Sequence, residues 1–134
     1  MNKKSLISLA ETISKECYFS VKRFAPDKDL KKYDSTKYFE FASNYLMNNR
    51  KNNIQSTGNF FKMLENCKSN TNRPTVRHAF GVRGGNNKII EVWINIILYN
   101  YNQELKKLSF DELHYVMAIA TRYAKIYNLD PPKR

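Results

Sequence analysis

The sequence predicts an all-α fold, a compact bundle of about five helices arranged around one long hydrophobic helix. The strongest observation is the segment from Ile89 to Leu105, which places apolar side chains on nearly every helical face over about four and a half turns. Several other segments repeat apolar residues at the steps of an amphipathic helix. No pair of turn residues separates two alternating apolar runs, so the sequence indicates no β-hairpin.

The central segment also fits a strand, because β-branched residues dominate from Ile89 to Leu98. The run continues without glycine or proline into Glu104, Lys106 and Lys107, which favours one helix over a strand. Glu91, Asn95, Asn100 and Asn102 interrupt the run, and it is too short to span a bilayer. We therefore expect a buried helix in a protein with no membrane segment.

The chain is expected to begin with two helices that are joined by an irregular connection. Ser5 can cap a first helix whose apolar residues recur at helical spacing and would cover one side of the core. The stretch from Phe24 to Asp34 contains a proline within a run of mixed charge, so it is predicted to be a mobile connection. Ser35 or Thr36 then starts a second helix that continues to about Asn49.

Two shorter helices come next. Ser56 or Thr57 can start a third helix that continues to about Cys67, with its phenylalanine and leucine side chains pointing inward. Pro74 is suited to the first turn of a short helix, and the Gly-Gly pair that follows would end it.

The last helix has the clearest start. Ser109 and Glu112 have the spacing of a capping box, and Leu108 with Leu113 would add the hydrophobic staple beside it. Apolar residues continue at helical spacing until the Asp-Pro-Pro sequence stops the helix, which leaves residues 129–134 as a tail. All the predicted elements belong to one helical domain, residues 1–134.

The composition narrows the possible partners and the compartment. The formal charge is +11 with a sequence pI near 9.7, which favours a polyanionic partner. Cys17 and Cys67 form no CxxC motif and no Cys/His cluster, so we expect free thiols in a reducing compartment, with no metal and no cofactor. No signal-peptide core or membrane span is evident, and the cytoplasm is the expected location.

The positive charge is concentrated in the middle of the chain. Between Phe41 and Ile90 there are eight basic residues and a single acid, Glu65, a net charge of +7. Lysine and arginine near helix ends can reach backbone phosphates, which indicates a nucleic-acid contact, although a solvated basic face is the alternative. Lysines outside this segment, such as Lys106 and Lys107, are expected to matter less. The predicted contact residues are Arg50, Lys51, Lys62, Arg73, Arg77 and Arg83.

Two other functions have some support. Arg73 and His78 have the R-x4-H spacing of HEPN-type RNA-cleaving domains, where the pair serves acid–base and phosphate-stabilising roles. His114 is expected on the surface. Helices near Ser56–Cys67 and Thr75–Val82 could also form a helix-turn-helix of a DNA-binding regulator. The chain has neither paired catalytic carboxylates nor a Walker-type glycine loop, so we do not expect an enzyme.

Two helical segments have a pattern that is similar to a known protein family. Ile54 to Cys67 reads IQSTGNFFKMLENC, a Thr/Ser-rich helix start followed by a basic residue and a paired aliphatic. Tyr115 to Asn128 reads YVMAIATRYAKIYN and closes with an aromatic-Lys-aromatic pattern. Together they resemble the small α-helical subunit of type III-A CRISPR effector complexes, the Csm complexes.

The resemblance implies a non-catalytic helical bundle in an antiviral defence ribonucleoprotein. It implies that guide RNA and target RNA are partners, contacted through their backbone phosphates, together with other effector-complex subunits and further copies of the chain itself. Gly58 and Phe61 depart from the family pattern, in which serine and a basic residue are usual at these two places.

Overall fold

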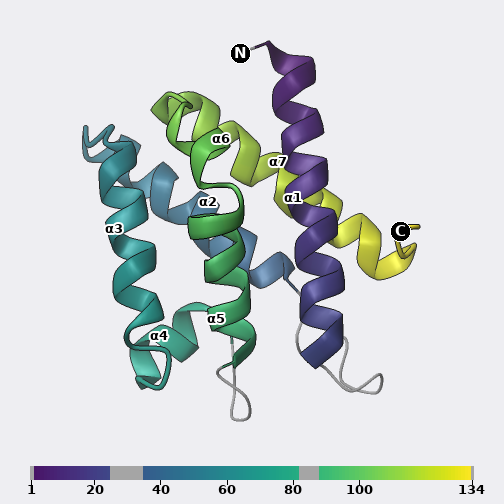
Figure 1. Cartoon of the computed structure of the whole chain (residues 1–134). Coiled ribbons are helices and arrows are strands. Elements are labelled where there is room, and N and C mark those ends of the chain that lie inside the picture. Colours follow the sequence, from purple (N-terminus) through teal and green to yellow (C-terminus); the bar gives the residue numbers. More distant parts are fainter. Residues whose placement is uncertain (1, 25–34, 82–87, 134) are drawn as a thin grey trace.

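The computed structural model describes residues 2–24, 35–81 and 88–133, and every regular element in these ranges is helical, with no strand. The predicted all-α fold class is therefore confirmed. Figure 1 shows the elements, which are numbered along the chain. They are α1 (Lys3–Phe24), α2 (Thr36–Lys51), α3 (Thr57–Lys68), α4 (Pro74–Ala79), α5 (Lys88–Asn95), the π-helical turn η2 (Ile96–Asn100), α6 (Asn102–Lys106) and α7 (Phe110–Leu129).

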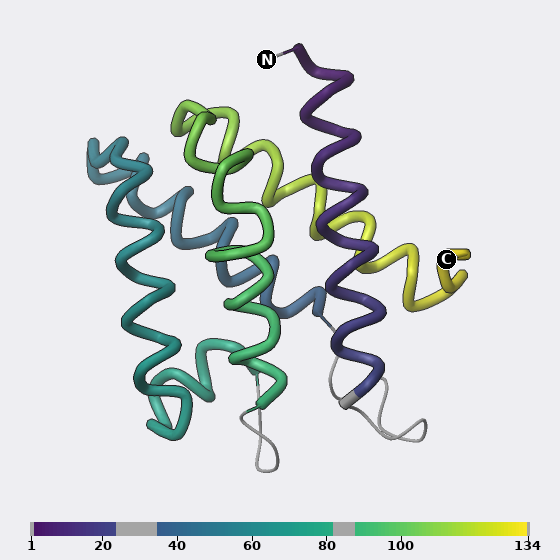
Figure 2. The backbone as a smooth tube through the Cα atoms, viewed as in Figure 1, coloured from purple at the N-terminus to yellow at the C-terminus, as the bar shows by residue number. Residues whose placement is uncertain are grey.

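The helices form two layers. In Figure 1, α3, α5 and α1 lie side by side, with α5 in the middle, and α2 and α7 cross behind them. Figure 2 shows that α3 and α5 run in opposite directions, as do α2 and α7. The C-terminal helix α7 packs against α2 in its own layer and against α1 in the front layer, so the first and last helices of the chain are in contact.

An aromatic cluster around Trp93 fills the centre of the bundle. Trp93 lies on α5 and is fully buried, as are its neighbours Tyr38, Phe39 and Phe80. The ring centroids of these three lie 5.9, 5.3 and 5.9 Å from that of Trp93, in edge-to-face arrangements that aromatic quadrupoles favour. These contacts join α2 and α5 to Phe80, the residue that follows α4. The apolar part of α5 is therefore buried, as predicted.

The expected single helix from Ile89 to Leu105 is not found, because it is divided at two points. Helix α5 gives way to η2 at Ile96, and the Tyr101 amide closes the wider turn by donating to the Ile96 carbonyl at 3.2 Å. Three consecutive apolar residues, from Ile96 to Leu98, are buried in this turn. The Asn100 side-chain amide donates to the Glu16 carboxylate of α1 at 3.5 Å, and η2 packs against α1. The described residues therefore contain seven α-helices, where about five were expected.

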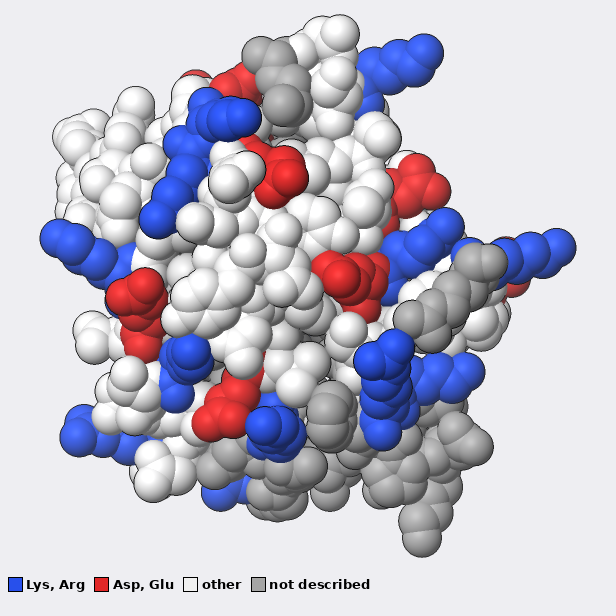
Figure 3. Space-filling view, viewed as in Figure 1, with Lys and Arg blue, Asp and Glu red and all other residues white. Residues whose placement is uncertain are grey.

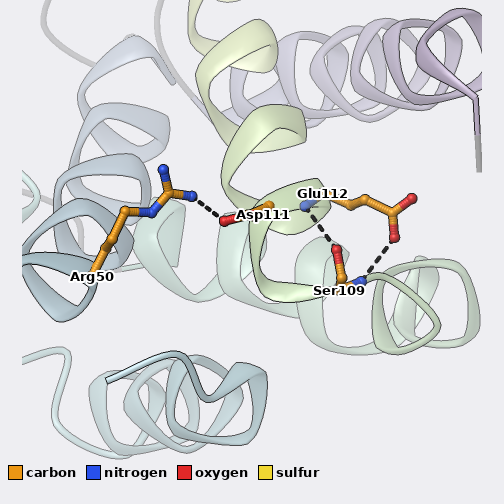
Figure 4. Close-up of polar contacts among 4 residues, drawn as sticks. All are labelled: Arg50, Ser109, Asp111 and Glu112. Atoms are coloured by element: carbon orange, nitrogen blue, oxygen red, sulfur yellow. Dashed lines mark hydrogen bonds and ion pairs between the residues drawn. The ribbon is translucent and has the colours of Figure 1, made fainter. Parts of the chain in front are cut away.

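The helix starts follow local hydrogen bonds. The capping box is confirmed, because the Ser109 hydroxyl accepts from the Glu112 amide at 3.2 Å and the Glu112 carboxylate accepts from the Ser109 amide at 2.9 Å (Figure 4). Ser56 caps α3 by one hydrogen bond, in which its hydroxyl accepts from the Asn59 amide at 3.3 Å. The first helix is found, but Ser5 is not its cap: α1 begins at Lys3, and the Asn2 side chain accepts from the Ser5 amide at 2.8 Å.

The remaining predictions concern the connections. Of the expected connection at residues 24–34, only Phe24 lies inside the described residues, as the end of α1. The Gly-Gly pair after α4 and Arg83 also lie outside the described residues. Residues 130–133 follow α7 without regular structure, whereas Leu129, the expected first residue of the tail, is the last residue of α7. None of the described helices is long and apolar enough to cross a membrane.

Candidate nucleic-acid interface

The predicted contact residues are distributed along α3 and at its two ends. Arg50 and Lys51 end α2, Lys62 lies on α3, and Arg73 and Arg77 lie at α4. Helix α3 has 12 residues and a length of about 18 Å, and Figure 1 shows the end of α2 and α4 at its opposite ends. The structure therefore brings these five residues to one edge of the molecule, but it does not gather them in one pocket.

Arg50 is held by the start of α7. Its guanidinium forms an ion pair with the Asp111 carboxylate (Figure 4), and its carbon Cζ lies 5.7 Å from the centre of the Phe110 ring. The two charged side chains are 44% and 76% exposed, so water screens the pair and it contributes little to stability. A phosphate that contacts Arg50 would have to compete with Asp111.

A small hollow of about 310 Å³ lies beside this ion pair and is lined by Arg50, Asp111, His114, Tyr115 and Ala118. Burial and the positive charge of Arg50 lower the pKa of His114, while the negative charge of Asp111 opposes that effect. His114 is half-buried rather than fully on the surface as predicted, because it faces this hollow. This environment favours the neutral form of its imidazole.

A second groove, between α3 and α6, combines two lysines that are far apart in the sequence. It has a volume of about 390 Å³ and is lined by Thr57, Gly58, Phe61, Lys62, Glu65 and Lys106. The Lys106 ammonium lies 5.7 Å from the centre of the Phe61 ring. In the described part of the chain, neither lysine forms an ion pair. Sequence reasoning placed Lys106 outside the basic segment, and no sequence pattern links it to Lys62.

Another pairing missed by sequence reasoning lies at the other end of α3. The Lys68 ammonium is 3.0 Å from the Tyr99 hydroxyl and 4.5 Å from the centre of its ring. Tyr99 belongs to η2, and its side chain is 55% exposed and lies outside the core. An exposed aromatic ring beside a cation is a common feature of surfaces on which nucleic-acid bases stack.

The arginines of α4 are placed differently from one another. Arg73 is exposed and precedes the helix in an extended conformation, whereas Arg77 is partly buried. The Nε and Nη2 atoms of Arg77 are shielded from solvent and have no hydrogen-bond partner among the described residues. Two of its three guanidinium nitrogens are therefore turned away from solvent.

The two alternative sites receive no added geometric support. No hydrogen bond joins Arg73 and His78, which are both exposed and both described. For a helix-turn-helix, α4 is short, with six residues and no buried side chain to fix its angle against α3. Cys17 and Cys67 are both free thiols.

Charge on the visible face is mixed. Figure 3 shows basic and acidic side chains distributed around an uncharged central area, in the same view as Figure 1. The basic residues visible there do not form one unbroken strip. Basic side chains on this face are therefore separated from one another by uncharged and acidic side chains.

Searches of protein-family models, curated proteins and solved structures find no match to this chain.

Proposed function

We propose that this chain is a non-catalytic RNA-binding subunit that contacts RNA phosphates through basic side chains. The observation that carries the proposal is the net charge of +7 between Phe41 and Ile90, most of whose described basic residues lie on α3, at the end of α2 and at α4. Lysine and arginine separated by about 18 Å of helix suit an extended backbone better than a small ligand.

The proposed role is that of a small subunit in a CRISPR ribonucleoprotein. Guide RNA and target RNA would be its partners, with neighbouring effector subunits and other copies of the chain in contact with its remaining surfaces. Base pairing between the two RNA strands would read the sequence, and this subunit would hold their backbones. Its contacts would then be independent of sequence and sensitive to salt.

The test compares two triple variants with the same loss of charge. Lys51→Ala, Lys62→Ala and Arg73→Ala remove three cations from the α3 edge, and Lys3→Ala, Lys4→Ala and Lys22→Ala remove three exposed cations from α1. Binding to a fluorescent single-stranded RNA is measured by anisotropy over a range of salt concentrations. The α3-edge variant should lower the salt slope by about 1.4 to 2, at about 0.7 for each of two or three lost phosphate contacts, and the α1 variant should lower it much less.

Equal losses in the two variants, or no RNA binding by the wild-type chain, would contradict the proposal. The RNA is also examined on a denaturing gel after incubation. Intact RNA is expected, whereas cleavage that Arg73→Ala or His78→Ala abolishes would favour the HEPN-type alternative. Strong preference for one duplex DNA sequence would favour the DNA-binding regulator.

A further inference from the structure

The groove between α3 and α6 brings together two ammonium groups with no acid paired to either one. Lys62 comes from the second turn of α3, and Lys106 is the last residue of α6. Like charges that line one groove repel each other, and that repulsion is relieved when an anion lies between them. The Phe61 ring lies 5.7 Å from the Lys106 ammonium, which favours a position of Lys106 over the groove.

We propose that this groove binds one phosphate group, with Lys62 and Lys106 as its two cationic ligands. The proposal rests on the proposed function only for the source of the phosphate, which would be the RNA backbone. It adds a specific site to that function, because it assigns one phosphate to a pair of lysines from separate helices.

The other groups in the groove suit the same ligand. The Thr57 residue supplies a hydroxyl donor, and the first amides of a helix have no partner within it. The Ser56 hydroxyl uses the Asn59 amide, which leaves the amides of Thr57 and Gly58 for an outside acceptor. At Gly58 even an added Cβ would meet nothing closer than the Ser56 hydroxyl at 3.6 Å, so the approach is open.

One acid limits where the anion can lie. Glu65 also lines the groove, one turn after Lys62 along α3. Its negative charge disfavours a phosphate at that end. The phosphate is therefore expected at the Thr57 end, between the two lysines and the start of α3.

The experiment uses the full chain and matched double variants. Lys62→Gln with Lys106→Gln removes both proposed ligands, and Lys62→Gln with Lys107→Gln removes the same charge but keeps Lys106. Lys107 is exposed and adjacent to Lys106 in the sequence, and it does not line the groove. Circular dichroism and thermal unfolding check that both variants fold.

The expected results depend on two lysines sharing one phosphate. The Lys62/Lys106 variant should lose about tenfold in RNA affinity and about 0.7 in salt slope, as for one phosphate and not two. The Lys62/Lys107 variant should retain most of the salt slope, because Lys106 still holds the phosphate. A slope loss of about 1.4 in the Lys62/Lys106 variant, or equal behaviour of the two variants, would overturn the shared site while RNA binding itself stands.

A second experiment tests phosphate binding in the groove without RNA. Inorganic phosphate is titrated into ¹⁵N-labelled protein at constant ionic strength, with chloride as the reference anion. The Thr57 and Gly58 amide signals should shift with phosphate in the wild type and not in the Lys62/Lys106 variant. If they shift while RNA fails to bind, the groove stands and the proposed RNA-binding function fails; if they do not shift in the wild type, the groove is overturned.

Discussion

Replacing Asp111 with asparagine should release Arg50 for a phosphate. In the structure the Asp111 carboxylate holds the Arg50 guanidinium beside Phe110, and both charged side chains are open to solvent. The substitution keeps the size of the side chain and removes its charge. RNA should therefore bind more tightly, and the salt slope should rise by about 0.7, the contribution of one further phosphate contact.

The same substitution should cost a little stability. An exposed ion pair contributes about 0.2 to 1 kcal/mol, and a negative charge in the first turn of a helix contributes about 0.3 to 1 kcal/mol. Asp111 provides both, because it lies in the first turn of α7 and pairs with Arg50. Urea unfolding of Asp111→Asn should therefore show a loss of about 0.5 to 2 kcal/mol.

The pKa of His114 gives an independent check on this geometry. Burial and Arg50 lower that pKa and Asp111 raises it, so Asp111→Asn should lower the His114 pKa further, as measured by NMR titration. Because the folded pKa lies below the unfolded value, the unfolded chain binds the proton more readily. The stability from neutral His114 is present above about pH 6.5 and is lost as the pH falls toward the folded pKa, more steeply in the variant.

Asp130→Asn is the matched control for these measurements. It makes the same charge change just after the other end of α7, about 30 Å away along a helix of 20 residues. A general effect of net charge would raise RNA affinity equally in both variants. Equal gains, or a loss of affinity in Asp111→Asn, would show that Arg50 does not contact RNA.

Three further predictions concern packing, capping and thiol reactivity. Trp93→Ala should destabilise the fold by about 3 to 5 kcal/mol in urea unfolding, because Trp93 is fully buried among three aromatic rings; a loss below 1 kcal/mol would contradict the core. Ser109→Ala should cost about 0.5 to 2 kcal/mol by removing the capping box, and an unchanged urea midpoint would refute its role. Burial raises the pKa of both thiols, and the effect is larger at the fully buried Cys17. A thiol reagent should therefore label Cys67 before Cys17 in the native protein, as followed by mass spectrometry. Labelling of Cys17 first would contradict this packing.

Features that depend on a few neighbouring residues could be predicted from the sequence. The capping box at Ser109 and Glu112 is an example, since its hydrogen bonds join residues three positions apart. The burial of Trp93 could be predicted as well, because a segment that is apolar on nearly all faces has to be covered. Neither feature requires knowledge of which helix packs against which.

Features that depend on tertiary contacts could not be predicted. The central helix breaks at Tyr101, where the chain meets α1; burial and the nearby Glu16 carboxylate raise the pKa of the Tyr101 phenol. No glycine or proline marks that break, so periodicity alone extends the helix through it. The candidate site has the same limitation, since Lys62 and Lys106 share a groove only because α6 turns toward α3.

The salt dependence of RNA binding by the wild-type chain tests the central proposal most directly. Affinity for two single-stranded RNAs of unrelated sequence is measured by anisotropy from low to physiological salt. The logarithm of the binding constant should fall linearly with the logarithm of salt concentration. The slope should be about −2 or steeper, as for three or more phosphate contacts, and it should be the same for both RNAs. Binding that is absent at low salt, or that does not depend on salt, would contradict the account.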